Sequence, residues 1–508
     1  MSKLLPETQK VRVTQTFAQP SGAVLESFDQ VIILLPEKAP AKVWKSVPDS
    51  SRLKKLLEQQ TASSNKILRT HLSSGAGLTV AEINTKSWPE SFKLLTQARQ
   101  IAGFALETKP TSLAVIPLGF SEVQARQLEE SQILALCAVD FRMPEFKSKK
   151  ATANKPKAQR LRKITLFGKR NSAMVKRALA EAEALNLVRW LTALPPNKLN
   201  AREYQTLIRA MARENGWQIK VHSETELKKA KAGAFLAVSQ GNATSDAAIV
   251  QLSYRPGKKS AKPDLALVGK GIIFDTGGTN LKPFKGMLDM HEDMAGSAVA
   301  LATLLALTLL KSPLPADCWL AITENRTGPK AYKPRDVVTA SNGTTIEVIH
   351  TDAEGRMALA DTLALAGKKK PRLILDFATL TGTCVAALTE RYSGVFTNRE
   401  KLHSLLIDAG NDSGERVWPF PMNDDFNEEL VSRNADVLQC AAAGGGDHIQ
   451  AAKFLQRFVP EKSAWVHMDL SAAARKGGVA QVPSGPTGFG VRYSLDLLLD
   501  KNVLKQLG

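Results

Sequence analysis

Short apolar segments that end in glycine or proline recur along the chain, and stretches with helical spacing of apolar residues separate them. Such short apolar runs are typical of buried strands. Strands that alternate with helices favour an α/β fold with a largely parallel sheet. In the first third of the chain, this pattern predicts strands at 29–36, 112–120 and 164–167 and helices at 89–107 and 172–194.

A pair of prolines, Pro195 and Pro196, marks the predicted domain boundary. Proline lacks a backbone N–H and clashes with the preceding turn, so the helix before it ends there. We expect a smaller N-terminal α/β domain over 1–170, a linking helix over 171–194 and a larger C-terminal α/β catalytic domain over 195–508. A mixed sheet flanked by helices is expected in the larger domain, with strands at 233–241, 247–254, 264–278, 318–323, 372–382 and 463–471 and helices at 297–310 and 358–366.

The net charge of +19, from 68 basic and 49 acidic residues, favours acidic partners such as nucleic acid. Much of this charge is local, because residues 147–163 contain eight cations and no acid: Lys147, Lys149, Lys150, Lys155, Lys157, Arg160, Arg162 and Lys163. The stretch is either a solvated surface loop or a phosphate-binding arm. It lacks the interleaved aromatic residues that stack on bases.

The sequence also predicts where the protein resides. The four cysteines lie far apart with no CxxC pair, which favours a reducing compartment. The first residues show no apolar signal segment, and the longest apolar run, 296–310, is too short to span a bilayer. We therefore expect a cytoplasmic protein that does not contact a membrane.

Several familiar catalytic motifs are missing from the sequence, among them HExxH, GxSxG, the GxxxxGK[ST] phosphate loop and a helix-opening GxGxxG. Instead, carboxylates and basic residues lie among glycines in two segments, 268–300 and 348–366. These two segments are the candidate functional regions.

In the second segment Asp352, Glu354 and Arg356 are spaced two apart. If the chain is extended there, all three side chains project to one side. Two neighbouring carboxylates repel each other unless a cation neutralises them, so the pattern favours a multivalent cation. Alternatively, the acids cap the helix that follows.

In the first segment Lys270 and Asp275 are five apart, so a regular strand would place them on opposite faces. Gly269 and Gly271 could bend the chain enough to bring both to one site. Asp293 could be the N-cap of the apolar helix after it. Lysines such as Lys270 and Lys282 are usually solvated, but a buried lysine can act as a ligand or an electrostatic catalyst. Oxygen ligands with one amine suit zinc, manganese or magnesium.

Both segments resemble the two signature stretches of the leucyl aminopeptidase family, cytosolic exopeptidases with two metal ions. The resemblance rests on HTDAEGRMALAD at 350–361 and extends, in family order, through RWLTALPPNKL, GAFLAVSQG, DFATLTGTCVAAL, SGERVWPFP, AAKFLQRFV and WVHMDL. It implies a metal-dependent aminopeptidase that hydrolyses the N-terminal peptide bond of peptides, with two divalent ions as cofactors and a homohexameric assembly.

The resemblance also implies residue roles. The expected metal ligands are Lys270, Asp275, Asp293, Asp352 and Glu354. Lys282 and Arg356 form the expected catalytic pair, Lys282 stabilising the oxyanion and Arg356 holding a bicarbonate ion that serves as general base. The expected substrate contacts are Met290, His350, Thr379, Leu380 and Gly382.

His350 is a departure from the family pattern, which has asparagine there. If the chain is extended, His350 faces the same pocket as Asp352 and narrows it. Alternatively, it points away and packs. His467 and Asp469, two apart on an apolar strand, are interpreted as packing residues, because no nucleophile motif accompanies them.

Overall fold

The computed structural model describes residues 4–7, 11–18, 20–59, 66–73, 75–148, 159–257, 261–443 and 445–507. The chain forms two compact units. Residues 7–183 and 477–484 make the N-terminal unit, and residues 1–6, 184–476 and 485–508 make the C-terminal unit. The observed mixed α/β architecture is the fold class that the sequence predicts.

The N-terminal unit is built on a six-stranded sheet in the order β1-β6-β5-β2-β4-β3, parallel except for β3. The strands are β1 Arg12–Thr16, β2 Gln30–Pro36, β3 Ile67–His71, β4 Gly77–Ile83, β5 Ser112–Pro117 and β6 Lys163–Phe167. The helices are α1 Gly22–Leu25, α2 Ala41–Trp44, α3 Ser50–Glu58, α4 Ser91–Leu106 and α5 Glu122–Val139. Predicted strands at 29–36, 112–120 and 164–167 correspond to β2, β5 and β6.

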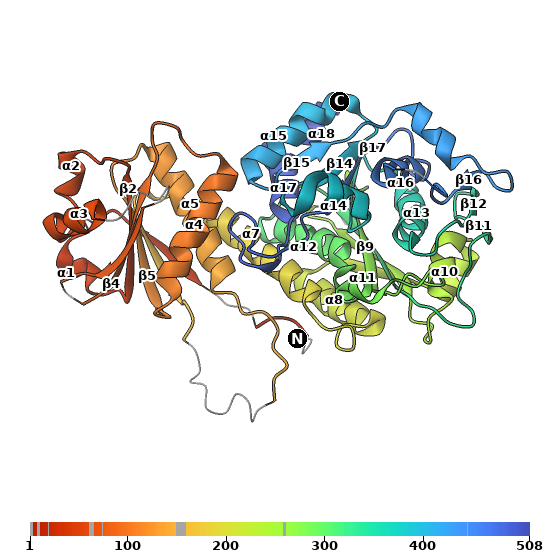
Figure 1. Ribbon diagram of the computed structural model, residues 1–508, viewed down its shortest axis with the longest axis horizontal. Coiled ribbons are helices and arrows are strands. Elements are labelled where there is room, and N and C mark those ends of the chain that lie inside the picture. The colour runs from red at the N-terminus through yellow and green to blue at the C-terminus, as the bar shows by residue number, and fades with distance from the viewer. Residues whose placement is uncertain are drawn as a thin grey trace. The chain divides into compact units, whose positions relative to one another are not determined.

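Alternate residues of β2 serve two cores in this unit. Ile32 and Leu34 pack with helices α4 and α5 on one face, and Val31 and Ile33 pack beneath α1 to α3 on the other (Figure 1). Val479 and Ala480 also join the first of these cores. Residues 477–484 therefore lie in the N-terminal unit, although the sequence prediction places all of 195–508 in the C-terminal domain.

The C-terminal unit has an eight-stranded mixed sheet in the order β15-β14-β17-β13-β9-β10-β8-β7. Its strands are β7 Gln218–Ser223, β8 Ala248–Tyr254, β9 Leu265–Asp275, β10 Ala316–Asn325, β13 Leu373–Ala378, β14 Ser393–Thr397, β15 Val417–Pro419 and β17 Ala464–Asp469. Strands β10, β9, β13 and β17 run parallel in the middle, and antiparallel pairings flank them. Smaller sheets contain β11 Val337–Thr339, β12 Thr345–Glu347 and β16 Val437–Leu438, and β18 Ala474–Arg475 with β19 Gly485–Pro486.

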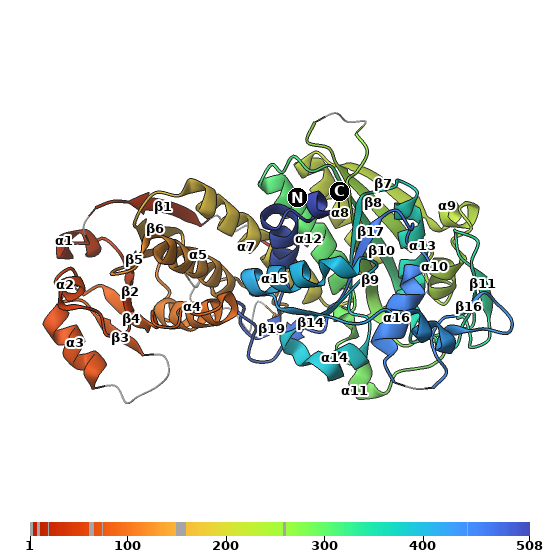
Figure 2. The ribbon, with the colours of Figure 1, turned by 90° about the horizontal axis from the view of Figure 1, so that it is seen from above.

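Helices cover both faces of this sheet. One core lies under α8 Ala201–Asn215, α12 Ala295–Leu309, α15 His403–Ser413 and α17 Val491–Leu495, and the other under α10 Gly233–Ser239, α13 Glu354–Gly367 and α16 Asp447–Gln456 (Figure 2). Helix α7, Ser172–Thr192, contributes its end to the first core. The short helices are α9 Glu224–Lys229, α11 Phe284–Met287, α14 Gly382–Leu388 and α18 Val503–Gln506.

Residues 233–241 were predicted as a strand, and this prediction is wrong, because residues 233–239 form helix α10. A short apolar run fits a buried strand and a buried helix equally well by periodicity. The deciding contact comes from far along the chain: the Asp361 carboxylate accepts a hydrogen bond from the backbone N–H of Phe235 at 2.8 Å. Gly233 is also required, since a Cβ there would lie 2.4 Å from the carbonyl oxygen of Thr339.

The segment Phe284–Leu309 is long and apolar enough to cross a membrane, with a mean hydropathy of 1.4. However, 83% of its most apolar window is buried inside the protein. Helix α12 thus covers the sheet with side chains that are apolar nearly all round, as expected for a buried helix.

Candidate metal centre

Strand β9 brings Lys270 and Asp275 to one face of the sheet through a β-bulge. Its register with β10 runs regularly to Ile272↔Thr323, and the next pair is Asp275↔Asn325. Three residues of β9 therefore oppose two of β10. The extra residue reverses the side-chain alternation beyond it, so two positions five apart share a face.

The glycines of β9 have a different role from the bending that the sequence suggested. A Cβ on Gly269 would lie 2.4 Å from the Cα of Ser297, and one on Gly271 would lie 2.8 Å from the carbonyl oxygen of Ala321. Gly269 thus permits close packing of helix α12 on the strand. The bulge, not glycine flexibility, aligns Lys270 with Asp275.

Asp293 and Glu354 reach the same point from two other elements. Asp293 follows the single turn Met290–Glu292, and its Oδ1 accepts a hydrogen bond from the Thr379 hydroxyl at 2.7 Å. The N-cap of α12 is Met294, so the interpretation of Asp293 as that cap is wrong. Glu354 is the first residue of helix α13.

The segment 352–356 is not extended, which corrects the expectation that its three charged side chains share one side. The backbone N–H of Ala353 donates to the carbonyl oxygen of His350, which makes a turn, and α13 begins at Glu354. Glu354 and Arg356 therefore diverge around the helix. Glu354 joins the acids, whereas Arg356 pairs with Asp447.

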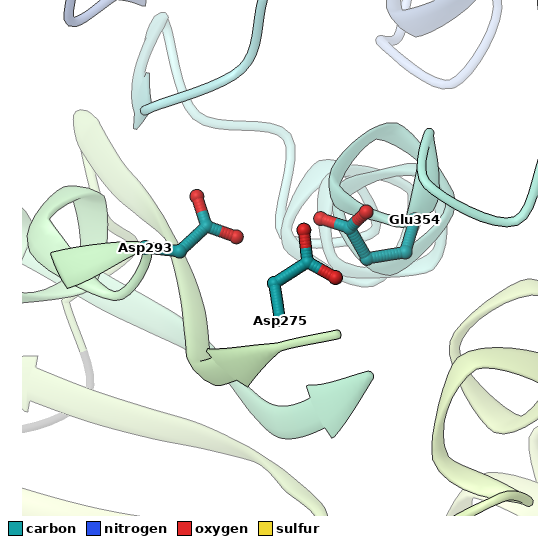
Figure 3. A group of neighbouring side chains, drawn as sticks. All are labelled: Asp275, Asp293 and Glu354. Carbon is teal, nitrogen blue, oxygen red and sulfur yellow. The ribbon is translucent and has the colours of Figure 1, made fainter. Parts of the chain in front are cut away.

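The three buried carboxylates of Asp275, Asp293 and Glu354 face one another, and one oxygen from each lies within 4.8 Å of the others (Figure 3). Two ammonium groups lie between the acids. Lys270 Nζ is 2.8 Å from Asp293 Oδ2 and 2.9 Å from Glu354 Oε1. Lys282 Nζ is 3.0 Å from Asp275 Oδ2 and 2.6 Å from Asp352 Oδ1. The structure thus brings all five predicted ligands and Lys282 together.

The electrostatics of this acid cluster favour cations. Burial, helped by the charge of Asp275, raises the pKa of Glu354 to about 8, and burial raises the pKa of Asp293 to about 6. Burial also raises the pKa of Asp352. For Lys270, burial opposes the charged form, but the surrounding carboxylates outweigh it and raise the pKa above its ordinary value. The acids therefore hold their charge only next to positive charge.

The side chains of the acid cluster have the atoms and the unmet charge that a metal ion needs. Glu354 Oε2 is buried and has no hydrogen-bond partner in the part of the chain that the structure describes. Unpartnered buried carboxylate oxygens are costly, and a cation relieves that cost. Carboxylate oxygens with one amine nitrogen are hard ligands that suit zinc, manganese or magnesium.

A surrounding layer of hydrogen bonds orients these carboxylates. Asn325 Nδ2 donates to Asp275 Oδ1 at 2.8 Å and to the carbonyl oxygen of Thr351 at 3.0 Å. The backbone N–H of Gly277 donates to the same Asp275 oxygen at 2.8 Å. Gly277 has φ +84°, and a Cβ there would lie 2.9 Å from Asp352 Oδ1, so this position requires glycine. Sequence reasoning missed Asn325, whose only signal is its place at the end of the strand next to β9.

Residues 379–381 are held by Asp469, at the end of β17. Its carboxylate accepts hydrogen bonds from the backbone N–H groups of Leu380 and Thr381 and from the Thr381 hydroxyl at 2.6 Å. The carbonyl oxygen of Thr379 then accepts from Lys270 Nζ at 2.9 Å. Asp469 therefore positions the loop that supports Lys270. Its neighbour on the strand, His467, is a buried partner of Asp376, with Nδ1 2.5 Å from Oδ1.

The five predicted substrate contacts are placed differently from one another. Thr379 and Leu380 are half-buried beside Lys270, and Met290 is half-buried in the turn before Asp293. Gly382 is exposed at the start of α14. His350 is also exposed, and its Nδ1 accepts a hydrogen bond from the backbone N–H of Asp352 at 3.2 Å. An extended chain does not carry His350 toward Asp352, because the two are joined by a turn.

Comparisons with known proteins agree on one family. Residues 186–495 match the profile described as the catalytic domain of the cytosol aminopeptidase family. A probable cytosol aminopeptidase of Syntrophotalea carbinolica is 39% identical over 417 residues, which is 80% of this chain and 80% of that protein.

Two solved structures are similar over nearly the full chain. The bottromycin maturation enzyme BotP in complex with Mn is 29% identical with a TM-score of 0.80, covering 93% of this chain and 99% of that one. A mutant of tomato leucine aminopeptidase is 25% identical with a TM-score of 0.84, covering 98% of each chain.

Proposed function

Because this chain belongs to the cytosol aminopeptidase family, we propose that it hydrolyses the N-terminal peptide bond of peptides with two divalent metal ions at the acid cluster. It is a metal-dependent hydrolase of the leucyl aminopeptidase type. The observation that carries the two-metal proposal is the cluster itself, in which Asp275, Asp293 and Glu354 converge within 4.8 Å and Asp352 lies beside them.

The proposed metal ligands are Lys270, Asp275, Asp293, Asp352 and Glu354. Two such ions, when bound, supply a nucleophilic water at neutral pH and polarise the substrate carbonyl. Lys270 must give up a proton to coordinate, and the charge of the ions in place of that proton favours the neutral amine. Zinc and manganese are the proposed metals, with magnesium the third that the ligands suit, and the similar structure that contains Mn supports this choice.

Lys282 is the proposed stabiliser of the oxyanion. Its ammonium group lies between Asp275 and Asp352. Burial opposes the charged form, but the two carboxylates outweigh burial and raise the pKa of Lys282 above its ordinary value, so it is a cation at neutral pH. A fixed cation at the edge of the cluster donates to the negative oxygen that forms as the carbonyl carbon is attacked. Met290, His350, Thr379, Leu380 and Gly382 are proposed to contact the substrate.

For Arg356 the family resemblance implies a bicarbonate ion as general base. In this structure, however, Arg356 Nη2 already donates to both oxygens of Asp447, at 2.7 and 2.8 Å. Bicarbonate therefore does not fit this guanidinium as it stands.

The assembly and location are proposals from the family alone: a homohexamer in the cytoplasm, acting on peptides. Nucleic-acid binding through 147–163 stays a prediction, because residues 149–158 lie outside the described residues. Of the flanking cations, Lys147 pairs with Glu145 at 2.6 Å, and Arg160 lies 3.9 Å from Glu7. Neither pairing favours a phosphate ligand.

The deciding experiment is a release assay on an N-terminal leucyl substrate with and without added manganese or zinc. Metal-dependent release of the first residue supports the proposal. Absence of such release from any aminoacyl substrate refutes it. Sedimentation tests the assembly separately, and a monomer at micromolar concentration would contradict the hexamer.

A further inference from the structure

Arg356 is a buried cation whose hydrogen-bonding nitrogens are largely engaged by one segment of its own chain. Only 2% of its side chain is exposed. Besides the two bonds from Nη2 to Asp447, Nη1 lies 3.4 Å from the carbonyl oxygen of Gln439. Nε has no hydrogen-bond partner among the described residues. A free carboxylate or bicarbonate needs two parallel N–H groups for a strong contact. Both parallel pairs of a guanidinium include Nη2, and in Arg356 Asp447 already engages Nη2.

Asp447 is well placed to hold this position. It is the first residue of α16, after Gly446, which has the left-handed conformation with φ +77°. A carboxylate in the first turn of a helix is favoured by the helix dipole. Its side chain is 38% exposed, so one edge of the Asp447–Arg356 pair is accessible to solvent while the guanidinium is not.

The segment that contains Asp447 is also tied to the metal centre. The Gln439 side chain accepts from the backbone N–H groups of Ile349 and His350 and donates to the carbonyl oxygen of Ala353. These residues form the turn that presents Asp352 and Glu354. At the other end, the backbone N–H of His448 donates to the Thr383 hydroxyl at 3.0 Å, next to the loop that Asp469 holds.

We propose that Asp447 supplies, from within the chain, the anion that Arg356 holds, so that peptide hydrolysis by this protein needs no bicarbonate. This inference rests on the proposed function. In the reaction, the Asp447 carboxylate accepts a proton from the attacking water as the new C–O bond forms. It returns that proton to the amine as the C–N bond breaks, so the carboxylate is regenerated.

The test compares the whole metal-loaded protein with Asp447→Ala in buffer freed of carbon dioxide and in buffer with added bicarbonate or formate. The wild type should show the same leucyl release in all three. Asp447→Ala should be slower by roughly 10²-fold without an added anion, the usual contribution of a general base, and should recover with bicarbonate or formate. Rescue by a small anion separates a chemical role from a merely structural one.

The matched control is Asp424→Ala. Asp424 also pairs with a buried cation: Lys453, which lies in α16, the helix that Asp447 begins, is 2.9 Å away. Asp424 does not contact Arg356. This variant should keep the wild-type rate and gain no response to bicarbonate. If Asp447→Ala folds poorly, as judged by circular dichroism, Asp447→Asn replaces it, since the amide keeps the size but cannot accept the proton.

A second measurement does not depend on activity. The carbon-13 signal of labelled bicarbonate should broaden with metal-free Asp447→Ala and not with the metal-free wild type. Bicarbonate broadening with the wild type, or an Asp447→Ala rate equal to that of the wild type without added anion, would overturn the proposal. A wild type that releases no residue with any metal instead refutes the proposed function, and the bicarbonate measurement still decides whether Asp447 fills the guanidinium.

Discussion

Both units of this protein bury glutamates, and one glutamate from each, Glu354 and Glu129, differ in what surrounds them. In the C-terminal unit, Glu354 lies against Lys270 and two further carboxylates, and burial with the charge of Asp275 raises its pKa to about 8. In the N-terminal unit, Glu129 on α5 is 3% exposed, and burial alone raises its pKa to about 7. A similar pKa shift therefore has two meanings. Glu354, clustered with lysines, belongs to a site. Glu129, whose pKa is raised by burial alone, lowers the stability of its unit when it is charged.

Replacing Glu354 should produce the largest effect. Glu354→Ala removes an acid from the centre of the cluster, so the proposed ions would lie close together and poorly screened. We expect loss of at least one bound metal, measured by elemental analysis, and loss of leucyl release below detection. Asp275→Ala should act in the same way.

The control for Glu354→Ala is Glu129→Gln in the other unit, which should retain metal and turnover. Full metal content with near-native turnover in Glu354→Ala would show that Glu354 is no more part of a metal site than Glu129 is.

Lys282→Ala should separate metal binding from chemistry within the C-terminal unit. Removal of this ammonium leaves the acids Asp275 and Asp352 with more unneutralised charge, so metal should remain bound. Turnover should fall by roughly 10² to 10³, the usual cost of one lost oxyanion donor. Lys285→Ala changes an exposed lysine of the same segment and should leave turnover unchanged. An unaltered rate in Lys282→Ala would remove this lysine from the mechanism.

Sequence reasoning pointed to two short segments, because carboxylates and basic residues among glycines favour a cation there. The individual ligands came from the family resemblance, and their roles stay a prediction. Sequence reasoning failed where the geometry depends on partners far along the chain. The bulge that aligns Lys270 with Asp275 exists only in the register of β9 with β10. The helix at 233–239 is decided in part by Asp361, more than a hundred residues later. For the same reason Asn325 and Asp447 carry no signal before the strands and helices are placed.

The glycines of the two units offer a further comparison, starting in the C-terminal unit. Gly296 lies in α12 where the helix touches β13, and a Cβ there would be 2.1 Å from the carbonyl oxygen of Phe377. Backbone cannot yield as a flexible side chain does. Gly296→Ala should therefore destabilise this unit by about 3 kcal/mol or more, seen as a lower midpoint in urea unfolding. An unchanged midpoint would mean that α12 moves away from β13 without lowering the free energy of unfolding.

Glu129→Gln tests, through pH, the buried acid of the N-terminal unit whose pKa is raised by burial alone. The folded pKa of about 7 lies above the ordinary 4.5, so the stability that this group contributes is full below about 4.5 and is lost as the pH rises through 7. Above pH 7 the charged carboxylate costs at most about 3 kcal/mol. The variant should be more stable by about 1 to 3 kcal/mol at pH 8, and the gain should shrink at pH 5. At pH 8, amide exchange in α5 should be slower in the variant than in the wild type, and this difference should shrink at pH 5. A difference between variant and wild type that is the same at both pH values would contradict the prediction.

The smallest expected effect comes from the counterpart of Gly296, Gly103 in α4 of the N-terminal unit. A Cβ at Gly103 meets nothing within 4 Å, and its φ is not in the left-handed region. Alanine there reduces the backbone entropy lost on folding without creating a clash, so Gly103→Ala should stabilise this unit by about 0.5 to 1 kcal/mol. The same substitution thus has opposite signs in the two units, because one glycine is a packing requirement and the other is not. Urea unfolding and amide exchange of α4 measure the gain, and leucyl release should be unchanged. A destabilised Gly103→Ala would show that something occupies the space beside α4 in the folded protein, and the contrast between the two glycines would then fail.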